Sequence, residues 1–447
     1  MLDRFLRLAE GEPGAIALIE TASRRVITRA ELVARAEELA AELLDAGVRE
    51  RDLIAVQLPN SAEFVAAILA ASKLDLVVVP IDRDAPQSEV VTILGHFAVR
   101  SLISPSQIRV TGQRTRPTSP ADARLIKLTS GSTGLPKGIV TSEANLIADC
   151  MSICSSMDIR AEDINFGAIP MSHSYGFSNL VMPLLVQGTA VVISNQYLPQ
   201  SVIDLCNEYR CTVVPLIPMV FEHLSNLPVD DGLFATARTF LSAGAPLEPS
   251  TSRRFRERFG APIHSFYGCS ECGGITYDRR GAAVERGSVG AAMNGVDLTI
   301  DSARLVVRSD SVALGYLHDA STFHPFELRT FVTDDIAEIV DGEVVLTGRV
   351  SDLINTAGKK VNPREVEQII LQLDGVREVK VYGTPAGARG DVVAAAVVAD
   401  PDVTRDQVRL HCAARLSAHK VPRIVKLIAQ LPVDERGKVK RAALAAL

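Results

Sequence analysis

Apolar residues along the chain fall into runs that predict alternating strands and helices. In DLIAVQLPNSAEFVAAILAASKLDLVVVPID (Asp52 to Asp82), two short apolar runs flank a longer one, and this pattern predicts strand, helix and strand in that order. Asn60, with Glu63 three residues later, is the predicted N-cap of the helix. A strand–helix–strand unit favours a parallel sheet, because a helix is the usual crossover between parallel strands.

Further elements continue this alternation. The segment ITRAELVARAEELAAELLDAG is a predicted helix with a capping box formed by Thr28 and Glu31, and it is predicted to end at Gly47. Another helix is predicted to begin at Asn145. Two later apolar runs are predicted strands, AVVIS and TVVPLIP. The fold class predicted for this part of the chain is therefore α/β, with helical layers on a parallel sheet.

The pattern changes twice toward the C-terminus. Between Gly281 and Arg349, short apolar runs alternate with turns and predict a small β-rich subdomain. After Arg349 the predicted order is helix, strand, strand, helix, strand, and the first of these helices has Asn362 as its cap and Pro363 at its first position. We therefore predict a large N-terminal domain over residues 1–350 and a small α+β C-terminal domain over residues 351–447.

Composition narrows the class of protein. A chain of 447 residues is too long for one core, and its 47% hydrophobic and 22% charged residues are ordinary for a globular protein. The net charge of −6 argues against a general nucleic-acid binder. No apolar run approaches the roughly 18 residues of a membrane span, and the first residues carry no apolar signal core. Seven scattered cysteines suggest reduced thiols, so a cytoplasmic location is expected.

The stretch LTSGSTGLPKG (Leu128 to Gly138) has the composition of a phosphate-binding loop. It holds three glycines, four hydroxyl residues and one lysine. Glycine lets backbone N–H groups approach an anion, hydroxyls add donors, and Lys137 adds a positive charge. The stretch does not match G-x-x-x-x-G-K-[ST], because Gly138 rather than Ser or Thr follows the lysine. The β-branched residues that come next predict a loop between two strands; the alternative is a glycine-rich surface turn.

Other segments place polar residues among small ones in ways that a core does not require. MSHSYGF contains His173 and Tyr175, although a lone histidine is more often structural. SFYGCSECGG places Glu271 on a glycine-flanked turn, where a carboxylate could hold Mg²⁺ or could simply be an exposed acid. Asp335 in FVTDDIAEI could accept hydrogen bonds from both hydroxyls of a ribose. Lys438 lies in a basic run, ERGKVKR, which taken alone would be a solvated surface.

The order of these segments resembles the adenylate-forming superfamily of acyl- and aryl-CoA synthetases, peptide-synthetase adenylation domains and luciferases. The resemblance runs from about Ile27 to the end of the chain. The glycine-rich stretch resembles the family's T-S-G-[ST]-T-G-x-P-K-G loop, and YGCSE resembles its Y-G-x-T-E. FVTDD resembles T-G-D, LTGRVSDLINTAGKKVNPREVE resembles G-R-x-x-D-x-I-x-x-x-G-x-x-[IV]-x-P-x-E-[IV]-E, and RGKVKR resembles [ST]-G-K-[IV]-x-R. The resemblance implies a large N-terminal domain and a mobile C-terminal lid.

The resemblance also implies ATP and Mg²⁺ as ligands. Phosphate would be bound by Thr129, Ser130, Gly131, Ser132, Thr133, Gly134 and Lys137. Mg²⁺ would be held by Glu271, together with Thr129. Adenine and ribose would lie against Gly244, Ala245, Tyr267, Gly268, Ser270, Asp335 and Arg349. Of these, Asp335 and Arg349 would hold the ribose.

The acid and the thiol would be bound by further residues that match the family. The acyl pocket would be bordered by His173, Ser174 and Tyr175, with His173 as its gate. The catalytic Lys438 would bridge the substrate carboxylate and the α-phosphate, where negative charge is crowded in the transition state. A tunnel for the thiol of CoA, or of a carrier protein's phosphopantetheine, would be bordered by Gly358, Lys359 and Lys360.

The chain departs from the family's pattern at a few positions. Ser351 stands where the hinge residue is usually Asp or Lys, and Asp334 stands in place of the glycine of T-G-D. Amino-acid-activating relatives have an aspartate just after the gate position; the residue here is Ser174, which disfavours an α-amino acid. We expect an apolar fatty or aryl acid as substrate.

Three alternatives to a CoA ligase remain. One is an adenylating enzyme that loads a carrier protein. The second is a non-catalytic nucleotide-binding regulator, disfavoured because Lys438, Glu271 and Asp335 are all retained. The third is a P-loop phosphohydrolase, disfavoured by the failed loop match. A zinc or redox role for Cys269 and Cys272 is disfavoured too, because a second cysteine pair is missing.

Overall fold

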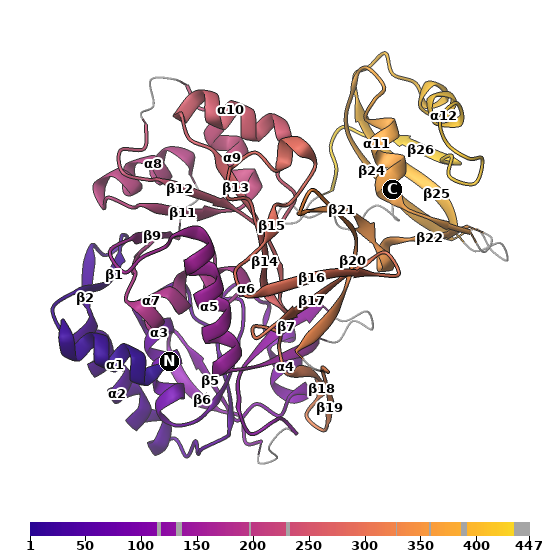
Figure 1. Ribbon diagram of the computed structural model, residues 1–447. Coiled ribbons are helices and arrows are strands. Elements are labelled where there is room, and N and C mark those ends of the chain that lie inside the picture. Colours follow the sequence, from indigo (N-terminus) through magenta and orange to yellow (C-terminus); the bar gives the residue numbers. More distant parts are fainter. Residues whose placement is uncertain are drawn as a thin grey trace. The chain divides into compact units, whose positions relative to one another are not determined.

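The computed structural model (Figure 1) describes residues 1–113, 118–130, 136–195, 198–228, 233–327, 329–356, 359–385 and 391–432. The chain divides into two compact units. The first comprises Met1–Leu298, Val307–Phe331 and Gly342–Val344, and the second comprises Thr299–Val306, Val332–Asp341 and Val345–Leu447. The predicted boundary at Ser351 lies inside the second unit, and the residue at which a mobile lid begins stays a prediction.

The first sheet of the large unit is mainly parallel, as the alternating pattern predicts. Within this unit its strand order is β15-β14-β13-β12-β11-β9-β10-β1-β2, and the strands from β13 to β1 are parallel to their neighbours. The strands are β1 (Ile16–Glu20), β2 (Arg25–Thr28), β9 (Ile164–Gly167), β10 (Ala190–Ile193), β11 (Val213–Leu216), β12 (Thr239–Ser242), β13 (Ile263–Cys269), β14 (Gly273–Tyr277) and β15 (Ala291–Ala292).

The second sheet of the large unit carries the glycine-rich stretch. Its order is β19-β18-β8-β7-β4-β3-β5-β6, with β7, β4, β3 and β5 parallel and the outer pairs antiparallel. The strands are β3 (Leu53–Val56), β4 (Val77–Pro80), β5 (Ser101–Ser104), β6 (Gln107–Val110), β7 (Ala123–Ser130), β8 (Pro136–Ser142), β18 (Gly315–Asp319) and β19 (Thr322–Pro325). The predicted parallel strand–helix–strand unit is confirmed as β3, the helix α3 and β4.

Helices follow most of these strands, and their starts test the capping predictions. They are α1 (Leu2–Gly11), α2 (Arg29–Asp45), α3 (Ala62–Lys73), α4 (Gln87–His96), α5 (Glu143–Met157), α6 (Ser174–Gly176), the π-helix η1 (Phe177–Val181), α7 (Met182–Gln187), α8 (Pro199–Glu208), α9 (Pro218–Ser225), α10 (Pro249–Phe259) and the 3₁₀ turn η3 (Val284–Arg286). The capping box of Thr28 and Glu31 is confirmed, and Gly47 follows α2 with a φ of +81°.

Two predicted helix starts are wrong by one or two residues. Ser61, not Asn60, caps α3, because the Asn60 side chain is used elsewhere. It donates to the carbonyl oxygens of Gly167 and Ile169 at 3.1 and 2.8 Å and accepts from the Met171 backbone. The helix predicted from Asn145 begins earlier, at Glu143. Ser142 is its N-cap, and Asn145 completes a capping box with it.

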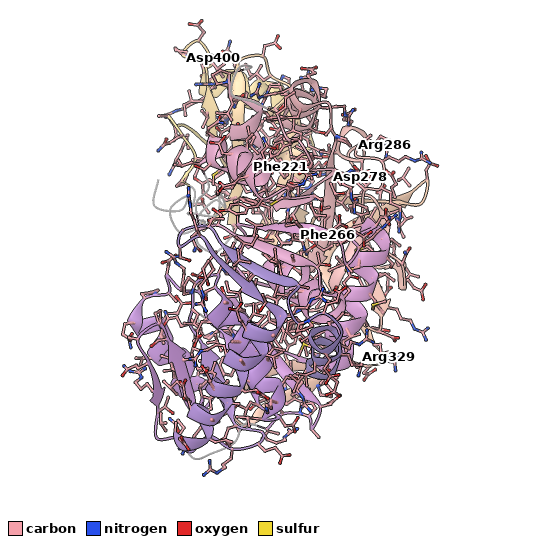
Figure 2. The ribbon with its side chains drawn as sticks, turned by 90° about the vertical axis from the view of Figure 1, so that its left-hand side faces the viewer. Phe221, Phe266, Asp278, Arg286, Arg329 and Asp400 are labelled. Carbon is pink, nitrogen blue, oxygen red and sulfur yellow. The ribbon has the colours of Figure 1, made fainter. Side chains whose placement is uncertain are left out.

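Aromatic side chains fill the core under the first sheet. Phe221, Phe240 and Phe255 are fully buried, and the rings of Phe221 and Phe255 meet edge to face with centroids 5.3 Å apart. Phe221 is labelled in Figure 2, as is Phe266 on β13. This packing holds β11, β12 and β13 together, so the carboxyl ends of these parallel strands lie along one edge.

The second unit contains part of the antiparallel middle of the chain and a small α+β sheet. Its elements are β16 (Val296–Asp301), β17 (Arg304–Ser309), β20 (Thr330–Val340) and β21 (Glu343–Arg349), each in whole or in part, then η4 (Val350–Asp352), β22 (Ile354–Thr356), β23 (Lys359–Val361), α11 (Pro363–Ile370), β24 (Val376–Pro385), β25 (Asp391–Ala399), α12 (Arg405–Ala413) and β26 (Ile424–Leu427). Figure 1 shows α11 and α12 beside the sheet β24-β25-β26. Asn362 caps α11 and Pro363 is its first residue, as predicted.

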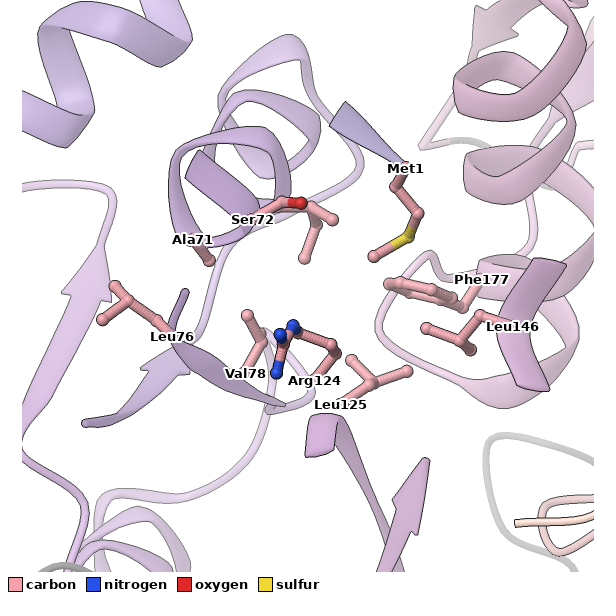
Figure 3. A pocket seen from close by; sticks show the side chains of 10 residues that line it. Met1, Ala71, Ser72, Leu76, Val78, Arg124, Leu125, Leu146 and Phe177 are labelled. Carbon is pink, nitrogen blue, oxygen red and sulfur yellow. The ribbon is translucent and has the colours of Figure 1, made fainter. Parts of the chain in front are cut away.

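The large unit also encloses a small cavity, shown in Figure 3. It measures about 10 Å³, and apolar side chains from α3, β4 and α5 line it together with Met1, Arg124 and Phe177. A space of this size holds about one water molecule and is too small for a substrate. Within the described ranges, no helix has both the length and the apolar character needed to cross a membrane.

Candidate active site

The glycine-rich stretch connects two paired strands. β7 and β8 are antiparallel, with Thr129 opposite Lys137 and Ser130 opposite Pro136. This confirms a loop between two strands and separates it from the nucleotide loop that leads into a helix. Thr129 and Lys137 are half-buried at the ends of the strands. The predicted phosphate ligands Gly131, Ser132, Thr133 and Gly134, and the side chain of Ser130, lie outside the described residues.

Glu271 lies on the tight turn between β13 and β14, and a tyrosine that the sequence did not single out holds it. The phenol of Tyr316 donates to the Glu271 carboxylate at 2.8 Å, and the Glu271 carbonyl accepts from the backbone of Ala313 at 2.8 Å. Tyr316 belongs to β18, which pairs with β8 so that Tyr316 lies opposite Ile139. The acidic turn is therefore tied to the strand that leads out of the phosphate loop.

Lys137 completes this cluster. Its ammonium group lies 5.6 Å from the centroid of the Tyr316 ring, within the range of a cation–π contact. Burial, followed by the Glu271 carboxylate, raises the pKa of Tyr316 well above its ordinary value. The phenol therefore stays protonated and keeps donating to Glu271. Tyr316 thus contacts a cation through its ring and a carboxylate through its hydroxyl, and this pair of charges suits a phosphate chain with its metal ion.

The predicted acyl segment follows β9 and runs from His173 through α6 into η1. His173 Nε2 and Asp82 Oδ2 lie 2.8 Å apart, and both side chains are partly exposed. The π-helix η1 comes directly after α6. Such a widened turn often occurs at functional sites. The histidine is thus fixed at the surface of the unit by a carboxylate from the loop after β4.

Ser174 and Tyr175 join the acyl segment to the other parts of the site. The hydroxyls of Ser174 and Ser270 are 2.8 Å apart, which connects this segment to the turn of Glu271. The Tyr175 phenol donates to the Leu241 carbonyl at 3.1 Å, and its ring centroid lies 5.8 Å from that of Phe266. Burial raises the pKa of Tyr175, so its hydroxyl is a permanent donor. Tyr175 therefore has aromatic and backbone neighbours, whereas His173 at the start of the segment faces the Asp82 carboxylate.

The residues predicted to flank adenine lie at the carboxyl edge of the parallel strands. Gly244 and Ala245 follow β12, and Tyr267 and Gly268 end the neighbouring strand β13, with Ser242 opposite Ser265. Gly244 has a φ of +87°, which favours glycine, and it is exposed. An exposed glycine beside a half-buried tyrosine leaves room for a flat ring to approach the backbone.

Asp335 and Arg349, both in the second unit, are paired with each other. Arg349 Nε donates to Asp335 Oδ1 at 2.8 Å, and the Asp335 side chain is 10% exposed while that of Arg349 is 55% exposed. The guanidinium group of Arg349 fixes the orientation of the Asp335 carboxylate. This geometry agrees with a joint role at the ribose hydroxyls, which stays a prediction.

Asp334 and Ser351, two of the residues that depart from the family's pattern, contact each other. The Asp334 carboxylate accepts from the backbone N–H of Ser351 at 3.2 Å. Lys359 and Lys360 lie on β23, which pairs with β22. Gly358 and Lys438 lie outside the described residues, as does the side chain of Lys360. The predicted roles of these residues in the hinge, the thiol tunnel and catalysis remain predictions.

The predicted metal ligands, Glu271 and Thr129, are oxygen donors of the kind that bind Mg²⁺ together with substrate phosphates. Among the described residues, no three His, Cys, Asp or Glu side chains come together as a complete metal site. Mg²⁺ is commonly bound by one or two carboxylates together with substrate phosphates and water. A carboxylate has about four acceptor positions, so the bond from Tyr316 leaves Glu271 able to coordinate a cation. Thr129 would add a hydroxyl from β7.

Comparison with protein families gives two matches. The family described as AMP-binding enzyme matches residues 5–117 and 104–317, and the family described as AMP-binding enzyme C-terminal domain matches residues 365–438. The first match contains every site residue described above from Asp82 to Tyr316, whereas Asp335 and Arg349 lie between the two matches.

Relatives and solved structures match this chain over at least nine-tenths of its length. The long-chain-fatty-acid–CoA ligase FadD13 of Mycobacterium tuberculosis is 26% identical over 97% of this chain and 95% of its own. The feruloyl-CoA synthase of an Amycolatopsis species is 26% identical over 92% of each chain. The crystal structure of ATP-bound MatB from Rhodopseudomonas palustris is 25% identical, with a TM-score of 0.84 over 100% of this chain and 98% of that one.

Proposed function

Because the chain belongs to the family of AMP-binding enzymes, we propose that this site activates a carboxylic acid as an acyl-AMP and passes the acyl group to CoA. The protein is an AMP-forming acyl-CoA synthetase. The observation that carries the proposal is the cluster of Lys137, Tyr316 and Glu271, because a cation and a carboxylate that could hold Mg²⁺ lie beside the strands that flank the glycine-rich stretch.

The proposed reaction has two steps. The substrate carboxylate attacks the α-phosphorus of ATP, the bond to the β-phosphate breaks, and pyrophosphate leaves. The thiol then attacks the acyl carbonyl carbon, the bond to AMP breaks, AMP leaves with the electron pair, and the thiol proton goes to solvent. Lys137 and the loop hydroxyls would hold the phosphates. Mg²⁺ bound by Glu271 would neutralise charge on them.

CoA is the proposed acceptor, and a carrier protein is the less favoured one. The relatives described above are named for CoA thioesters. Their acids differ, one being a long-chain fatty acid and the other an aryl acid, so they narrow the class of acid but do not identify it. Ser174 pairs with the hydroxyl of Ser270, and Tyr175 and Phe266 add aromatic surface. These contacts support an acid without an α-ammonium group.

A cytoplasmic location is also part of the proposal. All seven cysteines lie among the described residues, and each is a free thiol. A protein that needs no disulfide suits a reducing compartment.

An exchange assay tests the proposed function. The protein is incubated with ATP, labelled pyrophosphate and a panel of fatty and aryl acids, and exchange that requires an acid supports the ligase. The acid that gives exchange is then offered with CoA and with carrier-bound phosphopantetheine. Phosphate release without an acid would support a hydrolase, and neither activity would leave a non-catalytic nucleotide-binding protein as the better account.

Glu271→Gln tests the metal site. Glutamine can still accept the hydrogen bond from Tyr316, so the melting temperature should stay nearly unchanged, while loss of the charge should raise the Mg²⁺ needed for half-maximal adenylation by about tenfold or more. Glu257→Gln, an exposed acid on α10, removes the same charge elsewhere and is the matched control. An unaltered Mg²⁺ dependence in Glu271→Gln would mean that Glu271 is a surface acid held by Tyr316.

Asp335→Ala tests the ribose contact. Charge-assisted hydrogen bonds contribute about 1.5–3 kcal/mol, so ATP use should weaken roughly ten- to hundredfold. The control is Glu338→Ala, which removes an exposed carboxylate from the same strand. If Asp335→Ala has no effect, Asp334 is the next candidate. Titration of kcat/KM with ATP gives the answer. If a folded Asp335→Ala protein keeps its ATP affinity and adenylation rate, Asp335 does not belong to the site.

A further inference from the structure

A buried aspartate on α5 contacts two of the segments that build the site. Asp149 is 2% exposed. One of its oxygens accepts from the backbone N–H of Gly274 at 2.8 Å, and the other accepts from the hydroxyl of Ser178 at 2.6 Å. Burying a carboxylate costs free energy of folding unless it is hydrogen-bonded, so the two hydrogen bonds offset the cost of burying Asp149. Gly274 follows the turn of Glu271, and Ser178 lies on η1, which continues the acyl segment.

We propose that Asp149 is a positioning residue for adenylation, which fixes the turn of Glu271 and the acyl segment relative to β8, the strand that follows the glycine-rich stretch. This inference rests on the proposed function. Asp149 is not one of the predicted site residues. It acts through the Gly274 backbone and the Ser178 hydroxyl, which it holds by hydrogen bonds.

The helix α5 connects Asp149 to β8, the strand that follows the glycine-rich stretch. β8 leaves the loop and runs directly into α5, and the capping box of Ser142 and Asn145 fixes the first turn of the helix. Asn145 also donates to the Asp310 carbonyl at 2.8 Å. Asp149 lies one turn further along the same face of the helix. Figure 1 shows α5 next to α7, and it also contacts β14 and η1.

A stripe of buried polar residues continues along this face of α5. Asn145, Asp149, Ser152 and Ser156 follow one another at helical spacing, and each is at most 8% exposed. Ser152 and Ser156 hydrogen-bond the backbone of Asn294 rather than Gly274 or η1. The first half of the stripe therefore serves the site, and the second half provides a control of the same chemistry.

The turn of Glu271 packs directly on the carboxylate. Gly273 has a φ of +72°, and a Cβ atom built there would lie 2.2 Å from an oxygen of Asp149. On the opposite strand, a Cβ atom on Gly268 would lie 2.3 Å from the Gly273 carbonyl oxygen. Glycine is needed at Gly273 because the Asp149 carboxylate lies against it, and at Gly268 because the Gly273 carbonyl lies against it. A shift of the carboxylate would therefore shift the turn.

Three variants separate positioning from stability. Asp149→Asn can keep both bonds, since its oxygen can accept from Gly274 and its amide can donate to Ser178. Asp149→Leu has similar volume and loses both bonds. Ser152→Ala removes one buried hydrogen bond of the same helix, made to Asn294 and not to Gly274 or Ser178, and it is the control for stability. Acid-dependent pyrophosphate exchange is measured against Mg²⁺ and ATP, and the melting temperature of each variant is recorded.

Asp149→Leu should lower the rate of exchange between about ten- and a hundredfold and raise its Mg²⁺ requirement, because a small misplacement of a reacting group is costly. Asp149→Asn should recover most of the rate, and Ser152→Ala should exchange like the unaltered protein. If Asp149→Leu does not fold, Ser178→Ala takes its place and should show the same changes to a smaller extent. Equal behaviour of Asp149→Leu and Ser152→Ala would overturn the proposal, as would an Asp149→Asn protein as slow as Asp149→Leu.

Deuterium uptake distinguishes failure of this inference from failure of the proposed function. If the unaltered protein shows no exchange with any acid, the proposed function fails, yet the structural claim can still be measured. Asp149→Leu should then take up deuterium faster than Ser152→Ala in the peptide that contains Gly273 and Gly274. Uptake that is the same in both variants would overturn the positioning role by itself.

Discussion

Lys438→Ala is expected to slow adenylation by about 10²–10³-fold, the effect of removing one preorganised group that stabilises charge in a transition state. The carboxylate of the acid must approach an α-phosphate that is itself negative. Two like charges about 4 Å apart repel by about 4 kcal/mol at the effective dielectric constant near a protein surface, so a bridging ammonium group has a large effect. Lys438 lies at the end of the range that matches the family's C-terminal domain.

The second half-reaction provides the contrast for Lys438→Ala. Thioester formation from a supplied acyl-AMP should stay nearly intact, because the α-phosphate has already been substituted. Lys440→Ala removes the same charge two residues away in the same basic run and should leave both steps close to normal. If Lys438→Ala and Lys440→Ala are slowed equally, Lys438 contributes only to the general positive charge of this segment.

Gly358→Leu is expected to give the reverse result, blocking transfer to the thiol while sparing pyrophosphate exchange. A glycine at this position would leave room for the slender pantetheine arm, and a leucine side chain would occupy it. Displacing a reactant by about 1 Å can cost about 10²-fold in rate, so the loss of thioester formation should be at least of this size. Gly358→Ala adds a smaller side chain, so its rate of thioester formation should lie between those of the unaltered protein and Gly358→Leu.

The two variants together test whether the C-terminal domain rotates between the steps. Lys438→Ala would lose adenylation, which is measured as pyrophosphate exchange. Gly358→Leu would lose transfer to the thiol, which is measured as thioester formed from supplied acyl-AMP. If each variant damages both steps to the same extent, one fixed arrangement of the two domains serves the whole reaction, and the rotation has no support here.

Local features of the fold could be predicted from the sequence because they depend on neighbouring residues. The capping box of Thr28 and Glu31 and the start of α11 at Pro363 are confirmed, and so are the strands on both sides of the glycine-rich loop. Asn60 was predicted wrongly because tertiary contacts compete for its side chain. It bonds the chain near Gly167, more than a hundred residues away, and Ser61 takes the cap.

Long-range contacts explain what the sequence did not reveal about the site. Tyr316 reaches Glu271 only because β18 pairs with β8 in one particular register, and no local pattern specifies that register. Asp149 likewise gains its role from the packing of α5 against β14. Its polar spacing along the helix was a signal available in the sequence. Without the fold, however, a polar stripe is equally consistent with an exposed helix face.

The most direct test of the central claim follows oxygen atoms through the complete reaction. The acid that supports pyrophosphate exchange is labelled in its carboxylate with a heavy isotope of oxygen and incubated with ATP, Mg²⁺ and CoA. Attack of the carboxylate on the α-phosphorus predicts that one labelled oxygen from each acid molecule appears in AMP, as measured by mass spectrometry. Label that appears instead in inorganic phosphate, or AMP that carries none while the thioester still forms, would contradict an acyl-AMP intermediate.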